Sequence, residues 1–217
     1  MIEHIELSDR IYLQVKKMIF DQELKPGQKI LQEKLSAELG VSRTPLLKAL
    51  QQLENEMLVE SIPRRGLYVK ALQPQEIIDV FQIREVIEGL SARLSAQRMS
   101  PAEVGELRRL FAPFEQQRPI NRDDYAQADR DFHDAILKAS GNRVLPRLEM
   151  LGNIQLLAYQ VGLLRSPEET LPEHLKIIDA LAAGDGDAAE TWMRSHIRRS
   201  LETLHNYARS VRHEDAA

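Results

Sequence analysis

The sequence predicts a mainly α-helical protein, in which an N-terminal winged helix-turn-helix domain precedes an all-α helical-bundle domain. Two observations lead to this fold class. Residues 1–72 contain three short amphipathic helical segments followed by two short β-rich runs. Residues 73–217 show only helical periodicity, interrupted by turn-forming Gly and Pro. The length of 217 residues suits two modest domains, and we place their boundary between residues 72 and 73.

The first domain divides into elements that its turn residues delimit. We expect a helix over 9–21, a second over 31–39 that Gly40 ends, and a third that Ser42 caps. Strands are expected at 58–62 and 67–69, around a turn at 63–66. The positions expected to face the core of these helices are Ile11, Val15, Met18, Ile19, Leu31, Leu35, Leu39, Leu46, Ala49, Leu50 and Leu53.

The second domain follows a hinge near Leu72–Gln75 and reads as helical throughout. Turns rich in Pro and Gly separate six amphipathic segments in this domain. The segments show no internal repeat. The helices are expected near 75–98, 101–117, 122–140, 143–164, 168–183 and 187–211.

The composition excludes several classes of protein. There is no cysteine, which rules out disulfide frameworks, cysteine-ligated zinc fingers and thiol catalysis. No apolar run approaches the ~20 residues of a membrane span, and the first ten residues lack the pattern of a signal peptide. We therefore expect a cytoplasmic protein with no membrane partner.

The net charge of −4 is unevenly distributed along the chain. Residues 1–72 hold 11 Lys and Arg against 10 Asp and Glu, whereas the remaining residues hold 18 against 23. The first domain can therefore present a local positive face, which binding to nucleic acid requires. The basic residues that would form it are Arg43, Lys48, Arg64, Arg65 and Lys70.

Two short helices that meet at the tight turn of residues 39–42 fit a helix-turn-helix, whose second helix enters the major groove. Ser42, Arg43 and Thr44 would then reach phosphates and base edges, with Arg43 suited to guanine. Arg64 and Arg65 stand at the wing tip and could follow the backbone or enter the minor groove. The alternative is a helical hairpin and β-ribbon used for protein contact.

The motifs Leu-Lys-Pro-Gly at 24–27, Gly-Val-Ser-Arg-Thr-Pro at 40–45 and Arg-Gly-Leu-Tyr-Val at 65–69 resemble the GntR family of regulators. The C-terminal part resembles its FadR subfamily, whose sensor is called the FCD domain. The resemblance implies DNA contacts at Arg43, Thr44, Gln32 and Gly66. The chain departs from the family pattern at Leu47 and Lys48, where members commonly have arginine and glutamate, and at Gln32, where many have glutamate. Leu47 shares a helical face with Arg43, so we expect it to face DNA.

Four residues of the second domain could share a metal ion. Asp129 and His133 are four residues apart on one helix face, and His174 and His196 each lie ten residues from the turn at 184–186. In an antiparallel helix pair these two histidines stand level, so all four side chains can converge. Alternatively, the histidines bond locally or are exposed. The FCD resemblance implies the metal site: zinc or nickel is favoured, with manganese, cobalt and iron(II) left open.

A sensor function follows from a metal with open coordination positions, because a small carboxylate could fill them. The first sensor helix has inward positions at Val80, Phe81, Ile87 and Leu90, and Arg84 among them could clamp a carboxylate. The alternative for Arg84 is an ion pair with Glu88, one turn further along. Asn142 is expected to cap a helix rather than bind a ligand.

We therefore expect an effector-responsive, homodimeric transcription regulator that binds double-stranded operator DNA, acts as a repressor and is not an enzyme. The main alternative is a metal-dependent enzyme of the C-terminal domain, and a third is an interaction scaffold. The sequence contains no His-Glu-x-x-His or Gly-x-Ser-x-Gly motif, and Asp131 faces away from Asp129 by helical phase.

Overall fold

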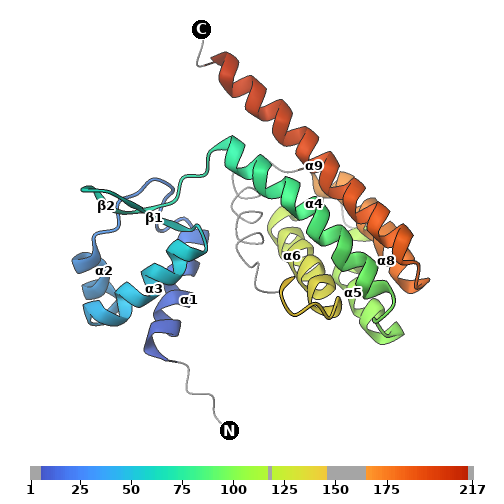
Figure 1. The fold of residues 1–217 in the computed structure, drawn as a ribbon, viewed down its shortest axis with the longest axis horizontal. Coiled ribbons are helices and arrows are strands. Elements are labelled where there is room, and N and C mark those ends of the chain that lie inside the picture. The colour runs from blue at the N-terminus through green and yellow to red at the C-terminus, as the bar shows by residue number, and fades with distance from the viewer. Residues whose placement is uncertain (1–5, 117–118, 146–164, 215–217) are drawn as a thin grey trace. The chain divides into compact units, whose positions relative to one another are not determined.

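The computed structural model describes residues 6–116, 119–145 and 165–214. The chain divides into two compact units, Met1–Gln73 and Pro74–Ala217, so the division falls one residue after the expected boundary (Figure 1). Within the described residues, no helix has both the length and the apolar character needed to cross a membrane.

The first unit is a three-helix core with a two-stranded wing. Helix α1 (Leu7–Phe20) packs against α3 (Arg43–Asn55), and the short α2 (Gln32–Leu39) lies beside α3. Strands β1 (Val59–Ile62) and β2 (Gly66–Val69) pair antiparallel, with Val59 opposite Val69. The side chains that fill the core match the expected helix phases, and they include Ile11, Val15, Ile19, Leu46, Ala49, Leu50 and Leu53.

The turn between α2 and α3 depends on Gly40. Its φ of 64° lies in the left-handed region that favours glycine. The N–H of Val41 donates to the carbonyl of Ser36 at 3.0 Å, which closes the end of α2. Ser42 then takes the N-cap position of α3 with an extended backbone, although its side chain makes no capping hydrogen bond. The turn therefore leaves the first residues of α3 at the surface.

One expected core position in this unit is wrong. Leu31 is 55% exposed, because α2 begins only at Gln32 and Leu31 occupies its N-cap outside the helical phase. Leu35 is the buried residue of α2, whereas Leu39 is half-buried at its end. The predicted inner face of Leu31, Leu35 and Leu39 is therefore reduced to Leu35, because α2 is shorter than expected.

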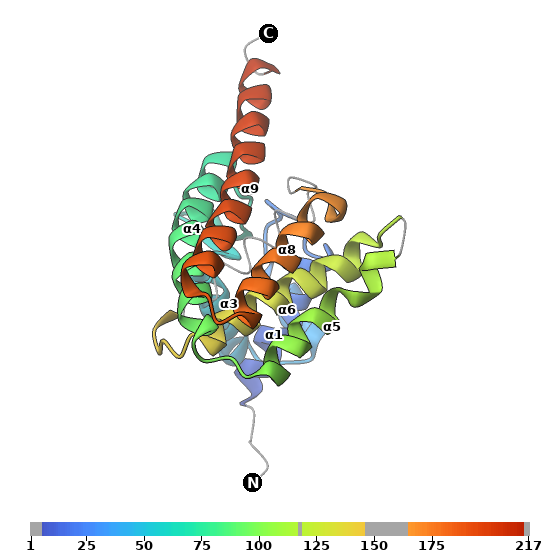
Figure 2. The ribbon, with the colours of Figure 1, turned by 90° about the vertical axis from the view of Figure 1, so that its right-hand side faces the viewer.

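The second unit is a bundle of α4 (Pro74–Ala96), α5 (Pro101–Gln116), α6 (Arg122–Ala139), α8 (Pro167–Ala182) and α9 (Gly186–Glu214). Figures 1 and 2 show α4 and α9 side by side along one edge of this unit, with α8, α6 and α5 on the other side. The helix expected at 143–164 lies almost entirely outside the described residues. The other expected boundaries are met within a few residues.

The inner face of α4 is confirmed in part. Val80 and Phe81 are buried and Ile87 is half-buried, as expected. Leu90 is 39% exposed, so its expected inward position is wrong. The adjacent Gly89 takes the inner position instead, where the Arg194 side chain packs so closely that a Cβ atom would lie 2.6 Å from its Cγ.

A tight turn between Ala182 and Gly186 joins α8 to α9 and fixes which of their residues lie side by side. Gly184 ends the first helix with a φ of 67°, and the N–H of Asp185 donates to the carbonyl of Ala180 at 3.0 Å. The side chain of Asp185 then accepts from the N–H of Ala188, which caps α9. The two helices therefore run antiparallel and adjacent from a defined turn.

Candidate functional site

The start of α3 presents an exposed polar surface. Ser42, Arg43, Thr44 and Lys48 are all exposed, and Leu47 is 39% exposed while Leu46 is fully buried. Leu47 therefore lies outside the core, on the face that its helical phase predicted. Nη2 of Arg43 donates to Oε1 of Gln32 at 3.2 Å. This bond places the α2 residue beside the α3 arginine.

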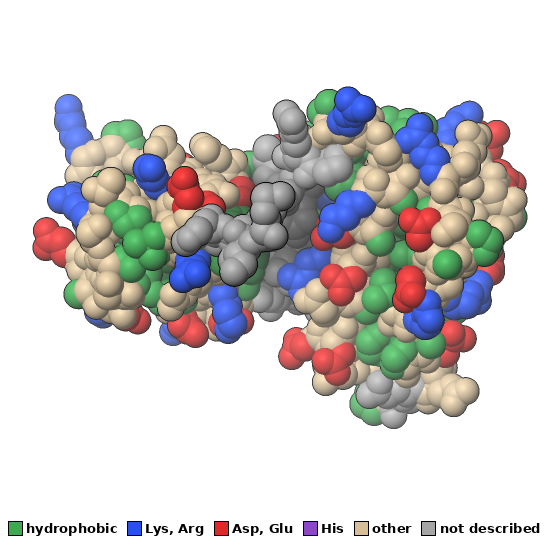
Figure 3. Space-filling view, turned by 90° about the horizontal axis from the view of Figure 1, so that it is seen from below, with side chains coloured by type: hydrophobic (Ala, Val, Ile, Leu, Met, Phe, Trp, Pro, Cys, Tyr) green, Lys and Arg blue, Asp and Glu red, His purple; other side chains and the backbone are tan. Residues whose placement is uncertain are grey.

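The turn between β1 and β2 forms a basic tip. Arg64, Arg65 and Gly66 are exposed, with positive φ angles at Arg64 (62°) and Gly66 (102°). The guanidinium of Arg65 lies over the ring of Tyr68, 5.7 Å from its centroid. Two cations thus protrude where a nucleic-acid backbone could be contacted. Elsewhere the charges are mixed, and the face in Figure 3 shows acidic and basic side chains interspersed over both units.

The second unit contains a buried cluster of one carboxylate and three imidazoles. Asp129 and His133 come from α6, His174 from α8 and His196 from α9. One candidate ligand atom from each lies within 4.8 Å of all the others. The rings of His174 and His196 are 4.5 Å apart, so the two histidines stand level across the hairpin as their spacing predicted. The structure thus brings all four predicted ligands together.

Each histidine of the cluster has a different partner at Nδ1. His133 Nδ1 lies 2.5 Å from Glu88 Oε2, and His196 Nδ1 lies 2.9 Å from Glu173 Oε2. The Nδ1 atom of His174 is 3.0 Å from the hydroxyl of Tyr125. These contacts leave the Nε2 atoms for the centre of the cluster, where those of His174 and His133 lie 3.2 Å and 3.8 Å from Oδ1 of Asp129. Such an arrangement fits a divalent transition metal, because ligand imidazoles commonly bond outward through their second nitrogen.

The charge balance also suits a cation. Burial raises the pKa of Asp129, but the His174 contact and the neighbouring histidines outweigh burial and hold that pKa well below its usual range. Burial and the charge of His196 lower the pKa of His174 to about 4. Burial lowers the pKa of His133, but Glu88 outweighs it and raises the pKa, so an incoming metal would displace a proton there.

Three basic side chains hold the carboxylate of Glu173, which lies behind the cluster. Arg165 donates to both of its oxygens at 2.7 Å, and Arg199 Nη1 donates to Oε1 at 2.5 Å. Burial raises the pKa of Glu173, but these arginines and His196 hold it well below its usual range. The carboxylate is therefore a fixed anion behind His196.

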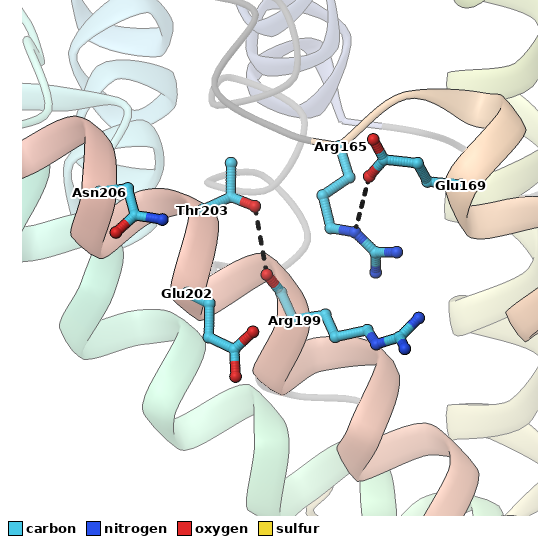
Figure 4. Close-up of a pocket in the computed structure, with 6 residues that line it drawn as sticks. All are labelled: Arg165, Glu169, Arg199, Glu202, Thr203 and Asn206. Atoms are coloured by element: carbon cyan, nitrogen blue, oxygen red, sulfur yellow. Dashed lines mark hydrogen bonds and ion pairs between the residues drawn. The ribbon is translucent and has the colours of Figure 1, made fainter.

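Arg165 and Arg199 thus form a clamp on Glu173. Both arginines also line an open pocket of about 430 Å³. Figure 4 shows Arg165 and Arg199 on its wall, with Arg165 also paired to Glu169. The remaining lining residues are Glu202, Thr203 and Asn206. Because both arginines contact Glu173, and Glu173 contacts His196, these residues lie between the pocket and the buried His and Asp cluster.

Arg84 is almost fully buried, with 1% of its side chain exposed. Its Nε donates to Glu88 Oε1 at 2.5 Å, and its guanidinium lies over the ring of Phe81. Nη1 and Nη2 are buried without hydrogen-bond partners among the described residues. Burial raises the pKa of Glu88, but the charges of Arg84 and His133 lower it to about 2. Arg84 therefore pairs with Glu88, which was the alternative predicted for it. Its Nη1 and Nη2 groups still remain as donors for a ligand.

The sequence did not lead us to predict that Glu173 and Tyr125 contact the histidines, although the position of each in the chain could have suggested it. Tyr125 stands one helical turn before Asp129, and Glu173 directly precedes His174 in the chain. Asp131 is exposed and bonded by Gln127, as expected. Asn142 accepts hydrogen bonds from the backbone N–H groups of Val144 and Leu145, while the helix it was expected to cap lies outside the described residues.

A winged helix-turn-helix unit followed by a helical unit with a buried ligand cluster defines the class of bacterial transcription regulators with a sensor domain. Comparison with known families agrees with this class. Residues 7–69 match the family described as bacterial regulatory proteins, gntR family, and residues 79–199 match the FCD domain. The chain belongs to the GntR family and carries an FCD domain. The relatives are transcription regulators rather than enzymes, so the metallo-enzyme alternative is not supported.

Individual relatives cover most of the chain. An HTH-type transcriptional regulator of an unstable DNA locus in Streptomyces ambofaciens is 30% identical over 89% of this chain and 83% of its own length. The HTH-type transcriptional repressor RspR of Escherichia coli is 25% identical over 97% of this chain and 92% of its own length. Among solved structures, E. coli McbR/YncC has a TM-score of 0.74 at 20% identity, covering 94% of this chain and 99% of that one.

Proposed function

We propose that this regulator binds operator DNA as a homodimer and that its FCD domain binds a small carboxylate beside a divalent metal ion. One observation carries the proposal: two donors of a buried guanidinium lack partners, one carboxylate away from a metal-ligating histidine. A buried donor without a partner is costly, and a bound carboxylate would satisfy both donors with two parallel hydrogen bonds.

The metal would be held by Asp129, His133, His174 and His196. Three imidazoles and a carboxylate suit zinc or nickel, and equally manganese, cobalt or iron(II). When bound, the ion supplies open positions for carboxylate oxygens. The protein supplies the orientation, since Glu88, Tyr125 and Glu173 hold the imidazoles through Nδ1.

DNA recognition would use the start of α3 and the tip of the wing. Arg43 with Gln32, Ser42 and Thr44 would reach into the major groove, and Lys48 would supply a phosphate contact. The exposed Leu47 would either touch a thymine methyl group or leave the site with one polar contact fewer. Arg64, Arg65 and Gly66 would contact the backbone beside it.

The link between the two sites would be a coupling between effector and operator affinity. Two relatives are named as repressors, RspR and the probable D-xylose utilization operon repressor of Paenarthrobacter nicotinovorans. We propose the same direction here, with the carboxylate releasing the operator. Its effect can be no larger than its differential affinity for the two states of the protein.

A mobility-shift assay on the promoter of the adjacent operon tests the proposal. Metal-loaded protein should retard this DNA, and one member of a panel of small hydroxy acids and dicarboxylates should change the apparent Kd. Retardation that no carboxylate of the panel alters would remove the sensing part of the proposal. Failure to bind promoter DNA under any condition would remove the regulatory part.

A further inference from the structure

The segment between α1 and α2 runs antiparallel beside β2 and adds a short third strand to the wing (Figure 1). Within this segment Lys29 lies directly opposite Tyr68. Backbone hydrogen bonds of 2.8 Å and 2.9 Å flank the pair on either side, whereas none joins the two residues themselves. In an antiparallel sheet, side chains stand closest at such a position. The backbone therefore places the Lys29 side chain against the Tyr68 ring.

The side chain of Lys29 reaches the tip of the wing. A Cβ atom at Gly66 would lie 3.5 Å from Cε of Lys29, so the absent side chain of this glycine leaves room for the lysine. The Nζ atom of Lys29 lies 5.9 Å from the centroid of the Tyr68 ring. The guanidinium of Arg65 lies over the same ring at 5.7 Å. One aromatic ring therefore holds two cations at the tip.

No acid among the described residues neutralises Lys29. Its side chain is exposed, and its contact is with the Tyr68 ring rather than with a carboxylate. The acid that faces Tyr68 from β1 is Glu60, and Glu60 is paired with Lys70 at 3.4 Å. A cation that is held by an aromatic ring keeps its full charge for an anionic partner.

We infer that Lys29 contacts the phosphate backbone of DNA beside Arg65, and that Tyr68 is a positioning residue for both cations. A lysine ammonium is a compact point charge, so it suits a phosphate group better than the paired acceptors of a base edge. The inference rests on the proposed DNA binding. It adds a contact from a segment that lies outside both α3 and the two wing strands.

The salt dependence of DNA binding by the full-length protein tests the Lys29 contact. Fluorescence anisotropy would measure it on the promoter duplex and on a duplex of random sequence. Each phosphate contact contributes about 0.9 to the slope of log K against log salt, so Lys29→Ala should flatten this slope by about one unit on both duplexes. Lys29→Arg should restore the slope, because it restores the positive charge.

Lys25→Ala is the matched control. It removes an exposed lysine from the same segment, next to the residues that pair with Val69 at the end of β2 away from the tip. The net charge changes equally in the two variants, but Lys25→Ala should leave the slope unchanged. Equal flattening in Lys25→Ala and Lys29→Ala would reduce the effect to net charge and would overturn the inference.

The positioning role of Tyr68 is tested by two substitutions in folded protein, with folding checked by circular dichroism. Tyr68→Phe keeps the ring and should bind both duplexes as the wild type does, since the hydroxyl contacts only the Arg65 carbonyl, at 3.5 Å. Tyr68→Leu should weaken binding to both. Lys29→Ala should then cost less affinity in Tyr68→Leu than in the wild type, because the two residues act together.

The outcomes separate this inference from the proposed function. Lys29→Ala with the slope of the wild type would overturn the Lys29 contact while leaving operator binding intact. Equal costs of Lys29→Ala with and without the Tyr68 ring would overturn the positioning role of Tyr68. A wild-type protein that binds neither duplex would overturn both the proposed DNA binding and this contact.

Discussion

The Nε atom of Arg84 lies 2.5 Å from Oε1 of Glu88, one helical turn further along α4. The other oxygen of this carboxylate lies 2.5 Å from Nδ1 of His133. The guanidinium, the carboxylate and the imidazole therefore form a continuous chain from the proposed effector donors to the proposed metal centre. A ligand bound at one end is in electrostatic contact with the other.

Arg84→Ala should weaken carboxylate binding to the metal-loaded protein by about 10- to 100-fold, because a charge-assisted pair in a buried site is lost. Isothermal calorimetry with the carboxylate found in the promoter assay measures this change. Arg108→Ala, which removes a half-exposed arginine of α5, is the control and should have no effect. If Arg84→Ala binds as tightly as the wild type, Arg84 is only the ion-pair partner of Glu88.

Glu173→Ala should raise the metal Kd roughly 10- to 100-fold, because His196 loses the acceptor that orients its ring. Chelator competition measures the Kd, and nitrogen NMR of the metal-free protein reports whether His196 still carries its proton on Nδ1. The control is Glu169→Gln, which removes the neighbouring acid that pairs with Arg165 without touching His196. Equal losses in the two variants would assign the effect to Arg165 rather than to Glu173.

Changes at α3 and at the wing should have different effects on DNA binding. Arg43→Ala should lower discrimination between operator and random DNA by roughly 1–3 kcal/mol, because a base contact is lost. Arg64→Ala and Arg65→Ala should weaken binding to both DNAs and flatten the salt dependence, because phosphate contacts are lost. Fluorescence anisotropy at several salt concentrations separates the two patterns. The same loss on both DNAs in all three variants would refute the division of roles.

The metal-free protein should lose stability in acid. His174 has a pKa near 4 when folded, whereas an unfolded histidine titrates near 6.5. Between these values the unfolded chain binds a proton that the folded protein does not, so the free energy of unfolding falls with falling pH, on the order of 3 kcal/mol. The raised pKa of His133 affects the free energy of unfolding only above pH 6.5, where the folded protein keeps a proton that the unfolded chain loses.

Urea unfolding in the presence of a chelator, at intervals between pH 7 and pH 4, measures this dependence. The His174→Gln variant should show a shallower slope, because it has no imidazole to protonate on unfolding. An unchanged slope in this variant would assign the acid sensitivity to His196, whose pKa burial also lowers, and to the carboxylates.

Helical phase predicts which side chains share one face of a helix. Residues one turn apart share a face, so the convergence of Asp129 with His133, and the outward position of Leu47, could be predicted. Phase does not say which neighbouring helix covers a face. For this reason Leu90 was misplaced, because α9 packs on the side of α4 that Gly89 occupies.

The outer partners of the histidines depend on packing between helices. Glu173 and His196 are 23 residues apart and meet only because the α8–α9 hairpin brings them level. Helix bounds are also hard to predict from sequence. Helix α2 begins one residue later than expected, so Leu31 lies outside it and is exposed. Sequence patterns could thus bring the four candidate ligands together, while the contacts of Arg165 and Arg199 with Glu173 required the structure.

Asp129, His133, His174 and His196 are proposed to hold one divalent metal ion. Elemental analysis of the purified protein tests this proposal most directly, with the double variant His133→Ala, His174→Ala as comparison. We expect about one transition-metal ion per chain in the wild type and little metal in the double variant, since two of the four proposed ligands are lost. The same metal content in both proteins would show that these four residues do not hold the metal.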